Sequence, residues 1–271
     1  MTLDGRATAM AGYYTRSTYR ALGCYATALL FCLATALWTC GAEDISEESA
    51  SREIISNGIG YSKASVGKTG IRFPKLTRYQ NQRILQQVNQ EIDKLTNTMG
   101  CEQGAVESTY EVRSLVTYAE KDIFSIYASA SYYCGGSYPT NDNNMSLTFD
   151  LKTGEMVSFP SLFRDYKADK KAILRVIFAK QVERAEKLAD EPGKDAKLDA
   201  GNNSCEDDPD IFSLEHLASS EFAFNFTKGG LQVQPVWPHV IEACAEKVTV
   251  PFPALHKFAE PKGILARVIA P

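Results

Sequence analysis

The chain has 271 residues, of which 44% are hydrophobic and 23% are charged, a composition typical of a globular protein. Its 29 basic and 33 acidic residues give a formal net charge of -4 at pH 7. Because nucleic-acid binding depends on an excess of positive charge, this balance argues against a nucleic-acid partner. No internal repeat or low-complexity tract stands out, which argues against a solenoid and against a disordered protein.

Residues 1–42 have the pattern of an export signal. Arg16 and Arg20 precede the uncharged run "ALGCYATALLFCLATALW", which is followed by small and then acidic residues. This order is that of a secretory signal peptide with a cleavage site around residues 40–42. The run is also close to the roughly 20 residues that span a bilayer, so an uncleaved anchor is the alternative. We therefore expect a periplasmic or secreted protein that meets the membrane only through this segment.

Lipidation of Cys40 is a further alternative. Residues 37–40, "LWTC", resemble a bacterial lipobox, whose cysteine is acylated. Trp38 and Thr39 are larger than the residues that this motif prefers. The sequence therefore favours a cleaved leader, followed by a polar linker over residues 43–54.

Four cysteines follow the leader: Cys101, Cys134, Cys205 and Cys244. None belongs to a Cys-x-x-Cys pair, so the spacing indicates neither a zinc site nor a thioredoxin-like motif. In an oxidising compartment these cysteines would form two disulfides, for which three pairings are possible. The alternative, four free thiols in a reducing cytosol, requires that the leader be misread.

Strand and helix patterns begin after the linker. "REIISNGIGYS" and "TGIRFPKL" have the pattern of extended strands, and the apolar residues of the stretch 78–95 recur at helical spacing. We place an N-terminal strand–helix unit at residues 55–100 and a C-terminal domain of helices and strands at residues 101–271.

Two long strands open the second domain. Residues 104–120 and 122–134 alternate at roughly period two, with a turn at 121–122, which predicts a hairpin. A second hairpin is predicted over residues 145–159. Its tip is at 152–154, where glycine can adopt a positive φ without steric cost.

The last part of the chain alternates helix and sheet. We predict a helix over 167–190, a polar loop over 191–210 and a short helix near 211–220. A hairpin over 221–237 follows, with its turn at 229–230, and then a strand over 246–252. A brief helix at 253–258 and a terminal strand at 264–270 end the chain. The sequence therefore predicts an α+β fold of antiparallel sheets built from hairpins, with two main helices, preceded by a signal peptide.

The order of these segments resembles that of the RsiV-type extracellular domain family. "IRFPKLTRYQNQRILQQVNQEIDKL" is similar to the opening unit of the family, an extended segment followed by a helix. "IFSIYASASYYCGGSYP", "LTFDLKTGEMVSFPSLF", "FAFNFTKGGLQVQP" and "VTVPFPALHKF" are similar, in this order, to the rest of it. The resemblance spans about residues 55–258.

The resemblance implies an envelope module that binds a lysozyme-like protein or a peptidoglycan fragment. In the family, this module is the lysozyme-sensing part of the RsiV anti-sigma factor and accompanies the catalytic domain of the peptidoglycan deacetylase PdaC. At most about 20 residues precede the leader, so we expect no sigma-binding domain. No stretch with the clustered Asp and His of a deacetylase is present in the sequence. We therefore expect the binding module alone.

The loop "YYCGGSYPTNDN" and the segment "PVWPH" depart from the family, and each lies beside a cysteine that the family lacks. We therefore favour a disulfide between Cys134 and Cys244, which leaves Cys101 with Cys205. That crosslink would gather the following ligand-binding candidates at one end of the sheet: Tyr132, Tyr133, Gly135, Gly136, Tyr138, Trp237, Pro238 and His239. Aromatic faces with polar tips suit carbohydrate stacking or a protein interface, and the alternative is that these rings pack in the core.

No complete catalytic constellation appears in the sequence. His216, His239 and His256 are the only histidines, and their spacing indicates neither a metal site nor a nucleophile with its base. The acidic run "CEDDPD" lacks the spaced ligands of a calcium loop. We therefore expect no enzyme activity, no metal and no cofactor. The alternative is a cell-wall polysaccharide-modifying enzyme, or an accessory protein, with an unrecognised site.

Overall fold

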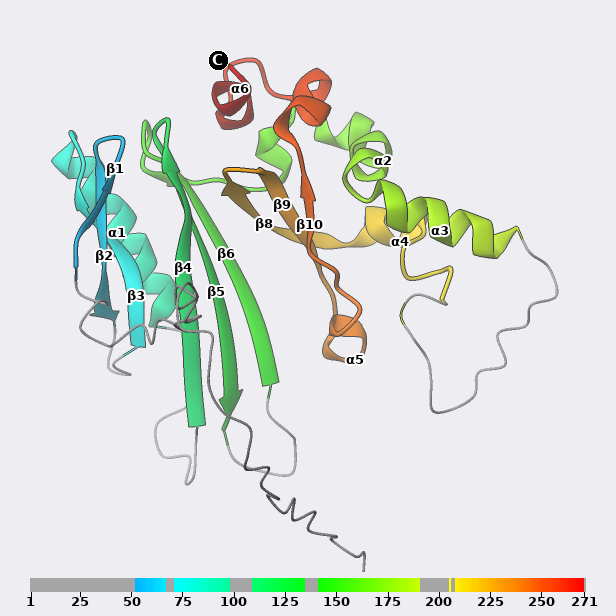
Figure 1. Cartoon of the computed structure of the whole chain (residues 1–271), viewed down its shortest axis with the longest axis horizontal. Coiled ribbons are helices and arrows are strands. Elements are labelled where there is room, and N and C mark those ends of the chain that lie inside the picture. The colour runs from blue at the N-terminus through cyan, green and yellow to red at the C-terminus, as the bar shows by residue number, and fades with distance from the viewer. Residues whose placement is uncertain are drawn as a thin grey trace, which may run out of the picture. The chain divides into compact units, whose positions relative to one another are not determined.

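The structure is a computed structural model that describes residues 52–66, 71–97, 109–134, 141–190, 205 and 208–270. These residues belong to one compact unit, Ile45–Pro271. Within them the chain forms three antiparallel sheets and six α-helices, which confirms the predicted α+β class (Figure 1). The predicted leader, with Cys40, lies outside the described residues. No helix in the described ranges is long and apolar enough to cross a membrane.

The first sheet contains β1 (Ile54–Ser56), β2 (Ile59–Val66) and β3 (Ile71–Arg78) in this order. The extended segment predicted at residues 69–76 corresponds to β3, and the one predicted at residues 52–62 contains β1 and the first part of β2, separated by a turn. The hairpin between β1 and β2 was not predicted, although its turn is an Asn-Gly pair. Asn57 and Gly58 both have positive φ, at 47° and 80°, which is the geometry that this pair favours in two-residue hairpin loops.

The predicted first helix is α1 (Gln82–Thr96). It begins at Asn81 because the side chain of this residue accepts hydrogen bonds from two backbone N–H groups of the first turn. Val88 and Ile92 are fully buried on the apolar face of the helix. Asn89 holds the helix against β3 by bonding both the N–H and the C=O of Leu76, at 2.9 and 2.8 Å.

The second sheet is long and consists of β4 (Thr109–Glu120), β5 (Ile123–Tyr133), β6 (Asn141–Asp150) and β7 (Glu155–Met156) in chain order. Both predicted hairpins are confirmed. Lys121 and Asp122 form the first turn, each with a positive φ. Gly154 closes the second turn with a φ of 79°, as its position at the predicted tip requires.

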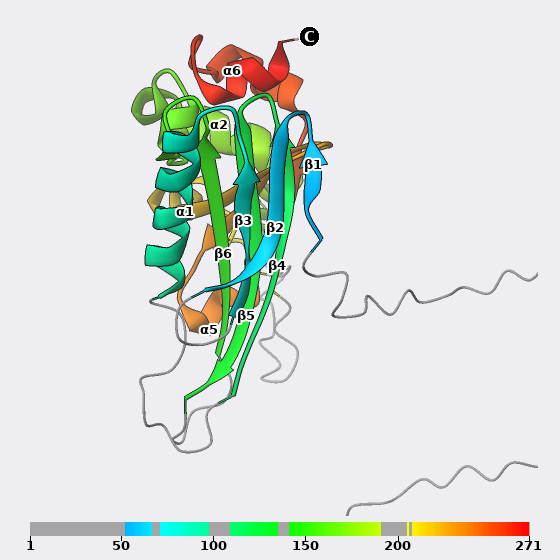
Figure 2. The ribbon, with the colours of Figure 1, turned by 90° about the vertical axis from the view of Figure 1, so that its left-hand side faces the viewer.

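Each face of the long sheet contributes to a separate core. Phe124, Ile126 and Phe149 are fully buried on one face, against the first sheet and α1. Figure 2 shows the first sheet and α1 in front of the long sheet. Tyr118 and Ile123 belong to the other core, which the C-terminal half of the chain completes.

The C-terminal half begins with helices and continues with the third sheet. Its elements are η2 (Pro160–Leu162), α2 (Tyr166–Ile177), α3 (Ala179–Ala189), α4 (Leu214–Ser219), β8 (Glu221–Thr227), β9 (Gly230–Val236), α5 (His239–Glu242), β10 (Val248–Val250), η3 (Phe252–Phe258) and α6 (Ile264–Ile269). The sheet has the order β10-β9-β8, so the hairpin predicted over residues 221–237 is confirmed.

Two predictions for this half are wrong. The single helix predicted over residues 167–190 is broken at Phe178, whose fully buried ring packs 5.8 Å from that of Phe222. The bend lets α2 and α3 both face one core. The predicted terminal strand is α6, because Ile264, Leu265 and the residues four positions later lie on one helical face toward the same core.

Four polar side chains join the long sheet to β8, and we call them the polar seam: Ser125, Ser146, Thr148 and Asn225. Ser125, Thr148 and Asn225 are at most 1% exposed. The Ser125 and Thr148 hydroxyl oxygens lie 2.8 Å apart, and Ser146 Oγ donates to Asn225 Oδ1 at 2.7 Å. Asn225 Nδ2 donates to the carbonyl of Ile126 at 2.7 Å. The hydrogen bonds satisfy these buried groups and fix where β8 crosses the sheet.

Candidate ligand-binding site

The candidates whose side chains the structure describes do not form the one aromatic surface that was predicted. Tyr132 and Tyr133 are adjacent at the end of β5, so strand alternation turns them to opposite faces of the long sheet. The Tyr132 ring lies 5.7 Å from that of Tyr110, on the face that meets the first sheet. Three further candidates lie outside the described residues: Gly135, Gly136 and Tyr138.

Trp237 is a core residue. It is 7% exposed, and its Nε1 donates a hydrogen bond to Ser220 Oγ at 2.9 Å. Its ring lies 5.3 Å from that of Phe212 and 5.4 Å from that of His216. The ring is therefore not available to stack on a ligand. Pro238 is exposed and precedes α5, and the side chain of His239 lies outside the described set.

The disulfide pairing favoured from the sequence is wrong. Cys205 is bonded to Cys244, with a Cα–Cα distance of 5.3 Å that suits a disulfide. Cys134 is also disulfide-bonded, while Cys101 lies outside the described residues. The Cys205–Cys244 bond ties the polar loop before α4 to the segment after α5. It does not tie the end of β5 to that segment, so it cannot gather the predicted candidates.

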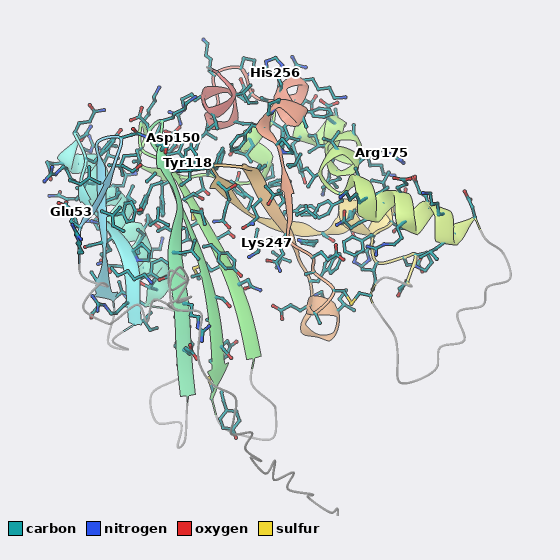
Figure 3. The ribbon with its side chains drawn as sticks, in the orientation of Figure 1. Glu53, Tyr118, Asp150, Arg175, Lys247 and His256 are labelled. Carbon is teal, nitrogen blue, oxygen red and sulfur yellow. A yellow bond between two sulfur atoms is a disulfide. The ribbon has the colours of Figure 1, made fainter. Side chains whose placement is uncertain are left out.

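The two histidines whose side chains are described lie apart. His216 is half-buried against Trp237, and His256 is exposed on η3 (Figure 3). Among the side chains that the structure describes, no group of three or more His, Cys, Asp and Glu residues is arranged to hold a metal ion.

A polar pocket of about 680 Å³, open to solvent along much of its surface and called the cavity below, lies at the turn end of the long sheet. Its walls come from residues 79–83, which lead into α1, from Asp122 in the β4–β5 turn, and from Leu151 and Lys152 in the β6–β7 turn. Three segments far apart in the sequence therefore meet there. The volume falls within the roughly 300–1,000 Å³ that is usual for small-molecule sites.

Hydrogen bonds between the three segments fix the walls of this cavity. Tyr79 Oη donates to Asp122 Oδ1 at 3.0 Å, and the N–H of Leu151 donates to the Asp122 carbonyl at 2.8 Å. Within the first segment, Gln82 Nε2 donates to the carbonyl of Tyr79 at 3.3 Å. Burial, and to a lesser extent the neighbouring Asp122, raise the pKa of Tyr79 above its ordinary value. The phenol therefore stays a neutral donor at physiological pH.

Two cationic side chains border the cavity. Arg83 and Lys152 are exposed, and neither makes a side-chain ion pair or hydrogen bond with another residue in the described ranges. Some other exposed cations are paired, as in Lys171 with Glu215 and Arg175 with Glu186, both at 2.6 Å (Figure 3). The cavity therefore combines fixed polar walls with two charges that are free to meet a ligand.

The C-terminal helix α6 braces the two turns that form the cavity. Lys121 Nζ donates to the carbonyls of Val268 and Ala270 at 3.3 and 2.5 Å. Arg267 Nη2 lies 2.7 Å from Asp150 Oδ2 in a largely buried ion pair (Figure 3). This pair is a charge contact without hydrogen-bond alignment, because Nη2 and Nε of Arg267 find no hydrogen-bond partner within the described part of the chain.

A second polar surface follows the long sheet away from the cavity. Tyr127 lies on the same sheet face as the polar seam, and its hydroxyl donates to Asn144 Oδ1 at 2.5 Å. Lys247, from the segment before β10, places its ammonium 3.4 Å from the centre of the Tyr127 ring (Figure 3). This contact is in the range of a cation–π interaction. Neither Tyr127 nor Lys247 was predicted as a site residue, and only their contact in the fold singles them out.

Comparisons with known proteins find distant fold similarity. No protein-family model matches the chain, and no curated protein matches it. The chain is similar to a DUF3298 family member of known structure from Bacteroides fragilis, with 12% identity and a TM-score of 0.46, over 82% of this chain and 99% of that one. It is also similar to a DUF3298 family protein from Pseudomonas aeruginosa, with 14% identity and a TM-score of 0.41, over 78% and 94%. The resemblance to the RsiV-type family stays a prediction.

Proposed function

We propose that the protein is an exported, non-enzymatic binding module of the cell envelope, and that it binds a lysozyme-like protein or a peptidoglycan fragment. The observation that carries this proposal is the polar cavity at the turn end of the long sheet. It has the volume of a small-molecule site, hydrogen-bonded walls and two cations that no side chain in the described ranges pairs. Such a cavity can receive a saccharide or a side chain that projects from a partner protein.

Two further points support the proposal. The bond between Cys205 and Cys244 and the oxidised state of Cys134 are typical of proteins that function outside the cytoplasm. The resemblance of the sequence to the RsiV-type family favours ligands of the bacterial cell wall. The disulfides bear on the compartment and the resemblance bears on the class of ligand, while the cavity indicates where the ligand would bind.

Calorimetric titration tests the binding. The chain without residues 1–42 would be titrated with lysozyme and, separately, with a soluble peptidoglycan fragment. We expect saturable binding of at least one of them. If neither binds at concentrations up to about 1 mM, the proposal is wrong.

Mass spectrometry tests the non-enzymatic part of the proposal. The peptidoglycan fragment would be incubated with the protein, and its mass would be followed over time. We expect an unchanged fragment. Release of products that depends on the protein would show instead that it is a wall-modifying enzyme.

A further inference from the structure

The cavity offers a ligand mainly hydrogen-bonding groups. Gln80 supplies a side-chain amide, and Gln82, Tyr79 and Asp122 supply acceptor oxygens beside the hydrogen bonds that they already make to one another, while Leu151 is the apolar exception. Most small-molecule pockets are largely apolar with a few polar groups. The reverse composition found here suits a ligand that is itself covered with hydroxyl and amide groups, as a sugar is.

The side chains that line the cavity carry more positive than negative charge. Arg83 and Lys152 contribute two positive charges against the single negative charge of Asp122, and one oxygen of Asp122 already accepts the hydrogen bond from Tyr79. A carboxylate on the ligand would balance the remaining positive charge. An arginine can hold such a carboxylate with two parallel hydrogen bonds.

The start of α1 does not supply this anion contact. Asn81 Oδ1 already accepts hydrogen bonds from the backbone N–H groups of Arg83 and Ile84, at 3.1 and 3.3 Å. A bound carboxylate must therefore be held by side chains, and Arg83 and Lys152 are the two cations that border the cavity.

We propose that this cavity binds an acidic amino sugar, a saccharide that carries a carboxylate on an otherwise neutral ring. Arg83 and Lys152 hold the carboxylate, and Gln80, Gln82 and Asp122 bond the hydroxyl and acetamido groups. This inference rests on the proposed function and narrows its ligand to the glycan part of a peptidoglycan fragment.

Two disaccharides that differ in one group test the inference. The first is N-acetylglucosamine linked to N-acetylmuramic acid, and the second is chitobiose, which lacks the lactyl group with its carboxylate. We expect the acidic disaccharide to bind the mature protein at least about tenfold more tightly in a calorimetric titration, a difference of about 1.4 kcal/mol. The preference should disappear in the double variant Arg83→Gln/Lys152→Gln.

A matched variant controls for the change in net charge. Arg164→Gln/Lys180→Gln removes two exposed cations from the C-terminal half of the chain, away from the cavity. It should keep the full preference for the acidic disaccharide. Because all four side chains are exposed, both double variants should retain the thermal unfolding midpoint of the unaltered protein, which circular dichroism would check.

Three outcomes would overturn the inference. Equal affinity for the two disaccharides would show that the carboxylate is not recognised, and equal weakening by both double variants would show that the cavity is not the site. Displacement of the acidic disaccharide by an equal concentration of inorganic phosphate would show a general anion site. In each case the proposed function stands if lysozyme or the peptidoglycan fragment still binds, and it fails separately if neither does.

Discussion

Tyr166, the first residue of α2, makes the stability of the protein depend on pH in the alkaline range. Its half-buried ring packs 5.6 Å from that of Phe159, and burial raises the pKa of Tyr166 from 10.0 to about 12. Between these two pH values the unfolded chain has lost the phenolic proton and the folded chain still holds it. The unfolded state then binds fewer protons, so the free energy of unfolding falls as the pH rises.

The variant Tyr166→Phe isolates this effect. From pH 10 to 12, the unaltered protein should lose about 1 kcal/mol more of its free energy of unfolding than the variant does, a value reduced for the partial exposure of the ring. Urea denaturation at several pH values would measure the difference. Parallel pH profiles for the two proteins would contradict the assignment.

Two adjacent glycines at the β8–β9 turn should respond differently to the same substitution. Gly230 has a φ of 149°, and a Cβ atom added to it would lie 2.2 Å from the carbonyl oxygen of Val250. A Cβ atom on Gly229 would meet nothing closer than 3.9 Å. We expect Gly230→Ala to lower the free energy of unfolding by about 3 kcal/mol and Gly229→Ala by less than about 1 kcal/mol.

Chemical denaturation of the two variants measures these losses. Because the glycines share one turn, Gly229→Ala controls for the general effect of alanine on the unfolded chain. Similar losses in both variants would mean that the close approach of β10 to Gly230 is not maintained in solution.

Elements with strong local signals could be predicted from the sequence. The helix α1 ends one residue beyond the predicted stretch 78–95, and the turns at 121–122 and 152–154 lie where predicted, because apolar periodicity and turn residues act over a few positions. The break at Phe178 and the helix α6 could not be predicted in this way. Both depend on side chains meeting a core whose other members come from distant parts of the chain.

The cavity could not be predicted because no local pattern marks it. Tyr79 and Asp122 are 43 positions apart in sequence and meet only once the first and second sheets have packed together. Trp237 illustrates the converse case. It appeared suited to ligand stacking, but α4 and the residues before it bury the ring. Sequence pattern identified suitable residue types, and tertiary packing decided where they lie.

The disulfide between the polar loop and the end of α5 gives a prediction for these two elements. A peptide map without reduction should contain a peptide from the region of Cys205 joined to one from the region of Cys244. Cys134 is disulfide-bonded and Cys101 is the one other cysteine after residue 42 of the sequence, so we expect a second joined species that links Cys101 with Cys134. A peptide that joins Cys134 with Cys244 would contradict the pairing found in the structure.

The same bond should contribute measurably to stability. Its two cysteines are 39 positions apart, and closing a loop of that length stabilises the folded state by roughly 4 kcal/mol through restriction of the unfolded chain. We therefore expect Cys205→Ser/Cys244→Ser to lower the free energy of unfolding by about 2 to 4 kcal/mol. A loss below about 0.5 kcal/mol would show that strain or residual structure offsets the crosslink.

At the scale of the whole compact unit, the two cores share the long sheet. One core lies between this sheet and the first sheet with α1, and the other lies between it and the C-terminal elements. The hairpin β4–β5 contributes apolar residues to both cores, so detaching it from one core would also expose apolar residues of the other. We therefore expect the unit to unfold in a single cooperative step.

Trp237 provides a direct test of this expectation. It is the only tryptophan after residue 42 of the sequence and reports on the C-terminal core, whereas far-ultraviolet circular dichroism reports on all three sheets. The denaturation curves recorded with the two probes should coincide. Separate midpoints would mean that the two cores unfold independently.

The brace formed by α6 also bears on how binding should be measured. Ala270, the last described residue, is held by Lys121, the neighbour of the cavity residue Asp122, so it lies at the cavity's end of the long sheet. An affinity tag, fluorescent reporter or sensor chip attached there would compete with the ligand for the same approach. Attachment at the N-terminus of a chain that lacks residues 1–42 avoids an obstruction that could otherwise be mistaken for lack of affinity.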